Sequence, residues 1–82
     1  MARRINLRFF GEEGLTGLKE CQEAQAKGEC VEHKVGEKGK WRWAKVEAVS
    51  IFEKPDDANG VGLVFLDLGP GGKGWPAKNI AS

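Results

Sequence analysis

Alternating polar and apolar side chains near the start of the chain predict a half-buried β-strand over residues 4–10. The apolar members of the alternation, which share one face, are Ile5, Leu7 and Phe9. The polar members between them, which share the other face, are Arg4, Asn6 and Arg8. One face of this strand should therefore cover a core, and the other should meet water.

A thin apolar stripe at helical spacing predicts one helix after that strand. A glycine-containing break at residues 11–14 separates the two, Thr16 is the expected N-cap, and Gly28 is the expected stop. The stripe consists of Leu15, Leu18, Cys21, Ala24 and Ala26. Because these side chains are mostly small, the helix should lie shallowly against a sheet and depend on that contact for its stability.

Four further strands are expected, over residues 30–35, 41–52, 61–68 and 75–80. The alternation changes parity in the second of them, which predicts a β-bulge near residues 48–50. Asn59-Gly60 predicts a hairpin, residues 61–68 are apolar on both faces as in a central strand, and Pro76 confines the last strand to an edge or a strand start. The predicted fold is therefore α+β and mostly antiparallel, in the order β-α-β-β-β-β.

Length and charge limit the possible classes of protein. The chain has 82 residues, close to the lower limit for one hydrophobic core, so we expect a single domain. Its 13 basic residues are balanced by 12 acidic ones, which is not the strongly basic composition of a dedicated duplex nucleic-acid binder. Any binding to nucleic acid would have to depend on a local patch.

Targeting signals are not evident in the sequence. The longest apolar run, residues 61–66, is far shorter than the ~20 residues that span a bilayer, and polar residues interrupt residues 5–10 in a way that a signal peptide does not show. We therefore expect a cytoplasmic protein without a membrane partner. Cys21 and Cys30 are interpreted as free thiols, because two cysteines do not make a disulfide framework.

Residues 39–80 resemble a Tudor domain, a member of the SH3-like barrels. The resemblance lies in residues 39–46 (GKWRWAKV), residues 64–69 (VFLDLG) and residues 75–80 (WPAKNI); the stretch 74–80 is also similar to the closing motif of SH3 domains. It implies a barrel of about five strands over residues 31–80, with residues 1–30 as a strand–helix element at its N-terminal side.

Tudor domains bind methylated lysine or arginine in an aromatic cage, through cation–π attraction. The resemblance implies that Trp41 or Trp43 would be a wall of the cage and that Asp67 would be a polar contact. This chain has Leu68 where that family has tyrosine, and it contains no tyrosine at all, so the cage is incomplete.

A basic and aromatic stretch is the main candidate for function. It comprises Lys34, Lys38, Lys40, Trp41, Arg42, Trp43 and Lys45, with Glu37 as the one acid among them. The leading hypothesis is an interaction module that binds a protein or peptide segment through Trp41, Trp43 and Trp75 with the nearby cations. In a structural alternative, Trp41 and Trp43 pack under the helix and the lysines form a solvated turn.

Two other functional hypotheses stay open. A nucleic-acid-binding accessory protein would place bases on the indoles and phosphates on Lys38, Lys40, Arg42 and Lys45. A small phage or mobile-element protein that inhibits a host factor is the third hypothesis. The sequence leaves the oligomeric state open under all of them.

Catalysis and metal binding are not expected. The single histidine, His33, and two thiols with eight residues between them do not supply the four ligands of structural zinc. The glycine-rich stretch 69–74 lacks the ending of a phosphate-binding loop and is interpreted as a turn. No nucleophile–base arrangement is recognisable, so we expect neither enzymatic activity nor a cofactor.

Overall fold

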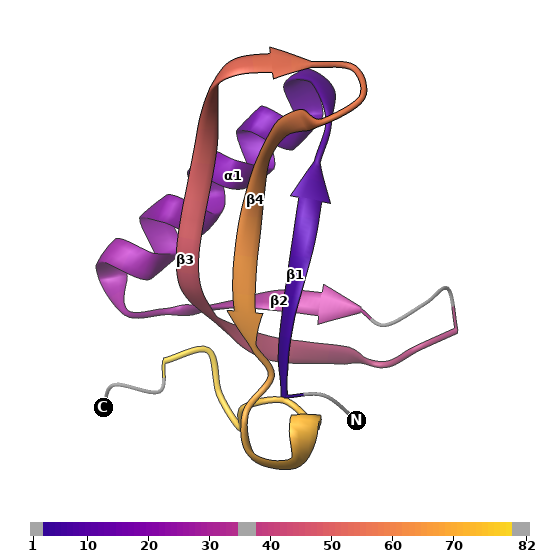
Figure 1. Ribbon diagram of the computed structural model, residues 1–82. Coiled ribbons are helices and arrows are strands. Elements are labelled where there is room, and N and C mark those ends of the chain that lie inside the picture. Colours follow the sequence, from indigo (N-terminus) through magenta and orange to yellow (C-terminus); the bar gives the residue numbers. More distant parts are fainter. Residues whose placement is uncertain (1–2, 35–37, 80–82) are drawn as a thin grey trace.

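One antiparallel sheet and one helix form the frame of the part of the chain that the structure describes, residues 3–34 and 38–79 of a computed structural model (Figure 1). The elements in chain order are β1 (Arg4–Phe9), α1 (Gly11–Lys27), β2 (Cys30–Lys34), β3 (Trp41–Asp56), β4 (Gly60–Asp67) and a short 3₁₀ turn, η1 (Pro70–Gly72). The strand order is β1-β4-β3-β2, and every neighbouring pair is antiparallel. The predicted α+β class is confirmed, as is the central place of the apolar strand β4.

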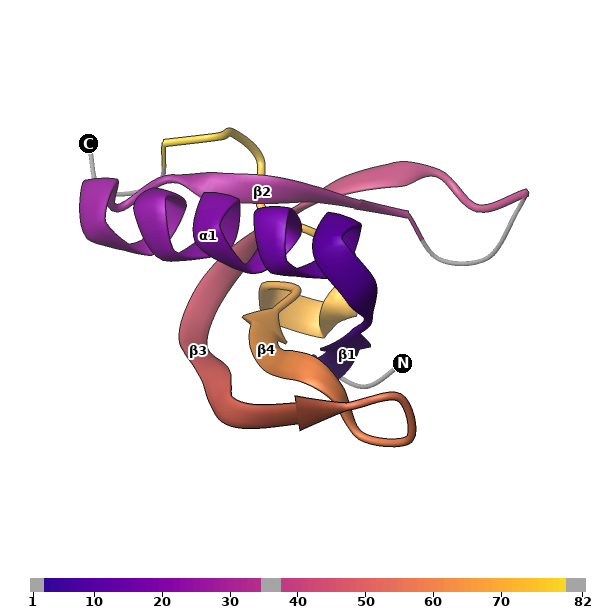
Figure 2. The same ribbon diagram turned by 90° about the horizontal axis from the view of Figure 1, so that it is seen from above.

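The long strand β3 curls the sheet into an open half-barrel. Its first residues pair with β2 and its later residues pair with β4, so it belongs to both halves of the sheet. A register shift between Val46 and Ala48 makes Glu47 the extra residue, next to the predicted bulge at residues 48–50. Figure 2 shows that β3 bends around β4. In Figure 1, β2 passes behind the lower half of β1, and Figure 2 shows that the two strands lie apart.

The expected fifth strand is reduced to two isolated bridges in the described residues. The segment after η1 bridges Trp75 to Trp43 at one end and Asn79 to Glu29 at the other, and Ile80 lies outside the described residues. Because Pro76 has no N–H, this segment cannot continue a regular ladder at that position. The barrel of about five strands is therefore corrected to a half-barrel of four strands.

The helix begins earlier than predicted. Phe10, not Thr16, is the N-cap residue, and Thr16 lies within the helix, where its hydroxyl donates to the carbonyl oxygen of Glu12 over 3.1 Å. Glu12 and Glu13 in the first turn interact favourably with the positive end of the helix dipole. The predicted stop is confirmed, because Gly28 has the left-handed conformation of a helix C-terminus, with φ +69°.

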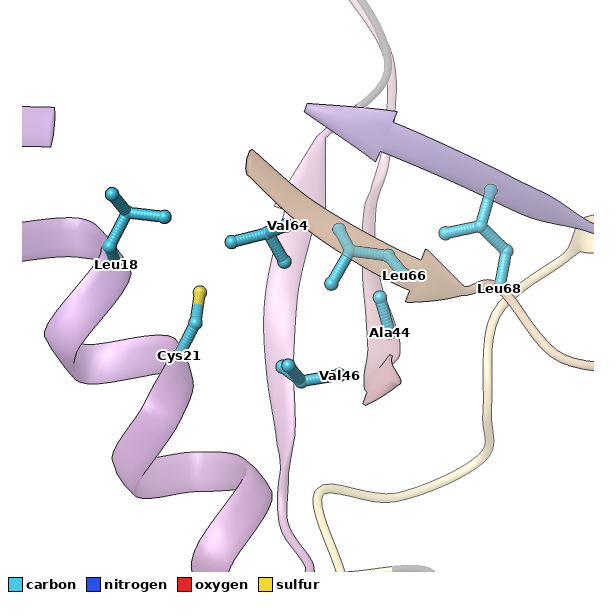
Figure 3. Close-up of a cluster of buried hydrophobic side chains, with 7 residues drawn as sticks. All are labelled: Leu18, Cys21, Ala44, Val46, Val64, Leu66 and Leu68. Carbon is cyan, nitrogen blue, oxygen red and sulfur yellow. The ribbon is translucent and has the colours of Figure 1, made fainter. Parts of the chain in front are cut away.

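The core lies between α1 and the concave face of the sheet (Figure 3). Figure 3 shows Leu18 and Cys21 of the helix pointing toward Val64 of β4. The remaining buried members come from the strands and the segment after β4: Ala44, Val46, Leu66 and Leu68. Ala26, which the stripe included, is exposed. The helix therefore docks through Leu18 and Cys21 more than through its alanines.

The longest apolar run of the sequence, residues 61–66, is too short to span a bilayer. In residues 3–34 and 38–79, no helix combines the length and the apolar character that a bilayer crossing requires.

Candidate binding surface

Three indole rings from two separate segments line one small hollow, here called the tryptophan hollow. Trp41 and Trp43 lie on β3, and Trp75 follows η1. The N–H of Trp75 donates to the carbonyl oxygen of Trp43 over 2.9 Å, which fixes the two segments side by side. The hollow has a volume of about 160 Å³, and its other lining residues are Glu32, Arg42 and Lys73.

The three indoles differ in exposure. Trp41 is 64% exposed and is among the large apolar side chains with the greatest contact to water, whereas Trp43 and Trp75 are half-buried. Trp41 therefore does not fill the interior. A ring of this size in contact with solvent offers a large apolar area to a partner at a low cost in conformational entropy.

Cations lie over two of these rings. The Lys34 ammonium is 5.9 Å from the centroid of Trp41, its partner across the β2–β3 ladder. The Arg3 guanidinium is 5.8 Å from the centroid of Trp75. Both distances lie within the range of cation–π attraction, so positive charge surrounds the rings from β2 and from the start of β1.

The four predicted basic residues do not form one patch. Lys38 and Lys40 are exposed just before β3, and Lys45 is exposed on β3, where it lines a different hollow with Gln25 and Glu29. Arg42 alone lines the tryptophan hollow, and its Nη1 donates to the carbonyl oxygen of Gly72 over 2.6 Å. Arg42 thus holds η1 against β3.

Lys73 takes part in the surface although the sequence interpretation assigned its segment to a plain turn. Its side chain lines the tryptophan hollow because η1 folds back toward β3. The position of Lys73 two residues before Trp75 was the sequence signal that could have indicated its place at the surface.

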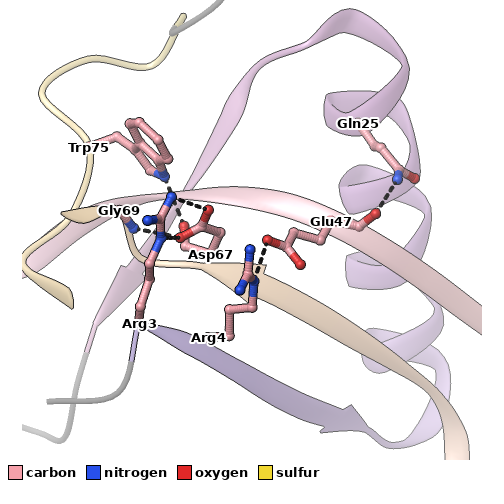
Figure 4. A network of polar contacts seen from close by, with 7 residues as sticks. All are labelled: Arg3, Arg4, Gln25, Glu47, Asp67, Gly69 and Trp75. Carbon is pink, nitrogen blue, oxygen red and sulfur yellow. Dashed lines mark hydrogen bonds and ion pairs between the residues drawn. The ribbon is translucent and has the colours of Figure 1, made fainter. Parts of the chain in front are cut away.

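Asp67 is a buried structural residue beside this surface (Figure 4). It is 4% exposed, and its carboxylate accepts from Arg3 Nε (2.8 Å), Arg3 Nη2 (3.1 Å) and the N–H of Gly69 (2.9 Å). The hydrogen bond from Arg3 holds the pKa of this carboxyl below its ordinary value, against the effect of burial. Its backbone oxygen accepts the indole N–H of Trp75 over 2.9 Å. Asp67 positions a ring and is not among the residues that line the hollow.

A second and larger hollow lies between α1, β1 and β2, with β4 as its floor; we call it the barrel hollow. Its volume is about 550 Å³, and the sequence interpretation missed it because its walls come from distant segments. Its apolar lining includes Leu7, Phe9, Val31, Trp43, Val64 and Leu66. Its polar lining includes Glu20, Glu32 and His33. Burial, and then the charge of Arg42, lower the pKa of His33, so this ring is mostly neutral at pH 7.

Both thiols also line the barrel hollow. Cys21 and Cys30 are free and buried, and burial raises the pKa of each one. Within the described ranges, no three His, Cys, Asp or Glu side chains lie close enough together to hold a metal ion.

Among the described residues, the tryptophan hollow is lined by flat apolar rings, the positive side chains of Arg42 and Lys73 and one carboxylate, Glu32, and Lys34 lies over Trp41. Such a set of groups suits contact with a ligand that carries an apolar anchor and negative charge. No known protein family, no curated protein and no solved structure matches this chain.

Proposed function

We propose that this chain is a small, non-catalytic interaction module that binds an acidic protein segment at the tryptophan hollow. The observation that carries the proposal is the convergence of Trp41, Trp43 and Trp75 on one hollow. Aromatic side chains that present rigid faces near the centre of a contact surface commonly contribute most of the binding energy.

The charges around the rings favour an acidic ligand. Of the residues that the structure describes, Arg42 and Lys73 line the hollow with the carboxylate of Glu32, and Lys34 lies over Trp41. A methylated lysine or arginine would meet more positive than negative charge there, which opposes the cation–π attraction of the rings. A segment with a leucine or aromatic anchor flanked by glutamate or aspartate has the complementary charge.

The test is a fluorescence titration of the indoles with three probes at two salt concentrations. The probes are a short synthetic peptide of glutamate, aspartate and leucine, a peptide containing trimethyllysine, and a short oligothymidylate. We expect the acidic peptide to bind most tightly, with a moderate loss of affinity as salt rises. Tighter binding of the oligothymidylate with a steep salt dependence would assign the surface to single-stranded nucleic acid instead.

Two variants make the titration specific. Trp41→Ala should weaken binding of the acidic peptide by about tenfold or more, because it removes the most exposed ring of the hollow. Phe65→Ala is the matched control, since Phe65 is also an exposed aromatic residue, at 42%, but lies on β4 outside the hollow. Equal affinities of the two variants, or no binding of the acidic peptide, would refute the proposed function.

A further inference from the structure

The half-barrel is open between its two end strands. β1 and β2 are the outermost strands of the order β1-β4-β3-β2, so the described sheet does not close on itself. The barrel hollow lies in this opening, with Leu7 and Phe9 of β1 on one side and Val31 of β2 on the other. These three side chains are only half-buried, which leaves apolar surface in contact with water.

In residues 3–34 and 38–79, β1 pairs with β4 alone, so the backbone groups on its other edge have no strand partner there. The N–H of Leu68 donates to the carbonyl oxygen of Arg3 over 2.7 Å, in register with the pairing of Arg4 to Asp67. In an antiparallel ladder, residues that exchange hydrogen bonds alternate with residues whose N–H and C=O point the other way. Ile5, Leu7 and Phe9 therefore bond to β4, and the N–H and C=O groups pointing to the outer edge belong to Arg4, Asn6 and Arg8.

A strand added at that edge would have two chemically different faces. Its inward side chains would lie beside Leu7 and Phe9 and enter the barrel hollow, where apolar groups are favoured. Its outward side chains would lie beside Arg4 and Arg8, which are both exposed. Arg4 Nε is paired with Glu47 Oε1 at 2.9 Å, and Arg8 Nη1 donates to the carbonyl oxygen of Asn59 over 2.6 Å, so Arg8 has no carboxylate partner among the described residues. Acidic side chains at the outward positions would face opposite charge across the pair.

Pairing with a second copy of this chain fits this edge poorly. Antiparallel pairing of β1 with β1 of another copy, centred on Asn6, would place Arg4 opposite Arg8 at both ends. Like charges directly opposite each other destabilise a strand pair. In that register the arginines oppose self-association and favour a partner of opposite charge.

From these four observations we infer a second binding site: the free edge of β1 accepts an extended strand of a partner protein in which apolar and acidic side chains alternate. The partner's backbone would bond to Arg4, Asn6 and Arg8, and its apolar side chains would fill the barrel hollow. Strand addition of this kind combines main-chain affinity with specificity from alternate side chains. The inference does not depend on the tryptophan hollow.

The test uses a short synthetic peptide of alternating valine and glutamate, titrated by calorimetry. Asn6→Pro removes the outward N–H at the middle of the edge and leaves the residues bonded to β4 in place, as edge strands tolerate. We expect this variant to lose about tenfold or more in affinity, whereas Asn6→Ala, which keeps the N–H, stays within about twofold. Equal binding by both variants would overturn the inference.

Four further measurements separate the alternatives. If Asn6→Pro does not fold, amide exchange of the wild-type chain decides, because the bound peptide should slow exchange at Asn6 and Arg8; unchanged exchange there overturns the inference.

A valine–lysine peptide should bind more weakly than the valine–glutamate peptide, and equal binding refutes the role of Arg4 and Arg8. Trp41→Ala should leave the strand peptide bound, and a loss would mean that it occupies the tryptophan hollow. Concentration-dependent dimers of the free chain that Asn6→Pro abolishes would show instead that a second copy fills the edge.

Discussion

Arg3 and Asp67 are 64 positions apart in the sequence and form a two-point contact, Nε to Oδ1 at 2.8 Å and Nη2 to Oδ2 at 3.1 Å. The same guanidinium lies 5.8 Å from the ring centroid of Trp75, whose indole N–H donates to the backbone oxygen of Asp67. Asp67, at the end of β4, thus holds Arg3 before β1 through its carboxylate and a wall of the tryptophan hollow through its backbone oxygen (Figure 4). Stability and the shape of the proposed binding surface should therefore change together.

Replacement of Asp67 by alanine should destabilise the fold by about 1–3 kcal/mol, because the N–H of Gly69 loses its acceptor in a buried place. Urea unfolding followed by circular dichroism measures this change in free energy. Asp57→Ala is the control, since Asp57 is exposed in the β3–β4 hairpin. If both variants unfold at the same urea concentration, the Asp67 contact does not stabilise the fold.

The free energy of unfolding should depend on pH partly through the carboxyl of Asp67. Its pKa is lowered in the folded state, chiefly by the hydrogen bond from Arg3. A lowered folded pKa contributes stability that is complete above the unfolded value, about 3.9, and is lost as pH falls through the folded value. Because Asp56 and Glu23 also have lowered pKa values, the wild-type curve alone does not isolate this group.

Asp67→Asn isolates it, because protonated aspartic acid is close to asparagine in shape and charge. The difference in unfolding free energy between the wild type and Asp67→Asn should be constant from pH 5 to pH 7 and should shrink below about pH 4. A series of urea curves across that range measures it. A difference that stays constant down to about pH 2 would contradict the role of the carboxylate.

The strands were predictable because their patterns are local. The alternation of residues 4–10 and the run of residues 61–68 reflect the two faces of single strands, and both were confirmed. Arg3 was not predictable as a partner of Asp67, because it reaches the carboxylate only after β1 has paired with β4. The bond from the N–H of Gly69 is a local turn contact, two residues along the chain. The interpretation of Asp67 as a ligand contact came from a resemblance in the stretch 64–69 and not from its surroundings.

The predicted helix start at Thr16 was wrong because it too is decided by a tertiary contact. Gly14, which belonged to the predicted break at residues 11–14, lies inside α1, and Phe9 of β1 approaches both it and Gly17 closely. A Cβ at Gly14 would lie 3.0 Å from the backbone carbon of Phe9, and one at Gly17 would lie 2.9 Å from its ring. Helix propensity disfavours glycine, and only the tertiary contact with β1 explains it here.

The docking of the helix should depend on Leu18 much more than on Leu15. Leu18 is fully buried against β4 and β3, so Leu18→Ala should cost about 2–5 kcal/mol through lost contacts and a cavity. Leu15 is half-buried, and Leu15→Ala should cost roughly 1 kcal/mol. The two variants change helix propensity equally, so a urea comparison isolates the packing. Equal losses would mean that the helix docks in a different orientation.

The two thiols should react slowly with Ellman's reagent while the chain is folded. Cys21 is 8% and Cys30 is 2% exposed, and burial raises the pKa of both, so access and thiolate fraction are low together. At pH 7.5 we expect labelling of the native chain to be at least ~100-fold slower than labelling in concentrated guanidinium chloride, because reaction requires an opening of the fold. Cys21→Ser and Cys30→Ser, each leaving one thiol, assign the rate of the other. Rapid labelling of the native chain would show that the barrel hollow opens without unfolding.

Since both thiols line that hollow, the same measurement repeated with the valine–glutamate peptide should show slower labelling still, as an inserted strand would cover them.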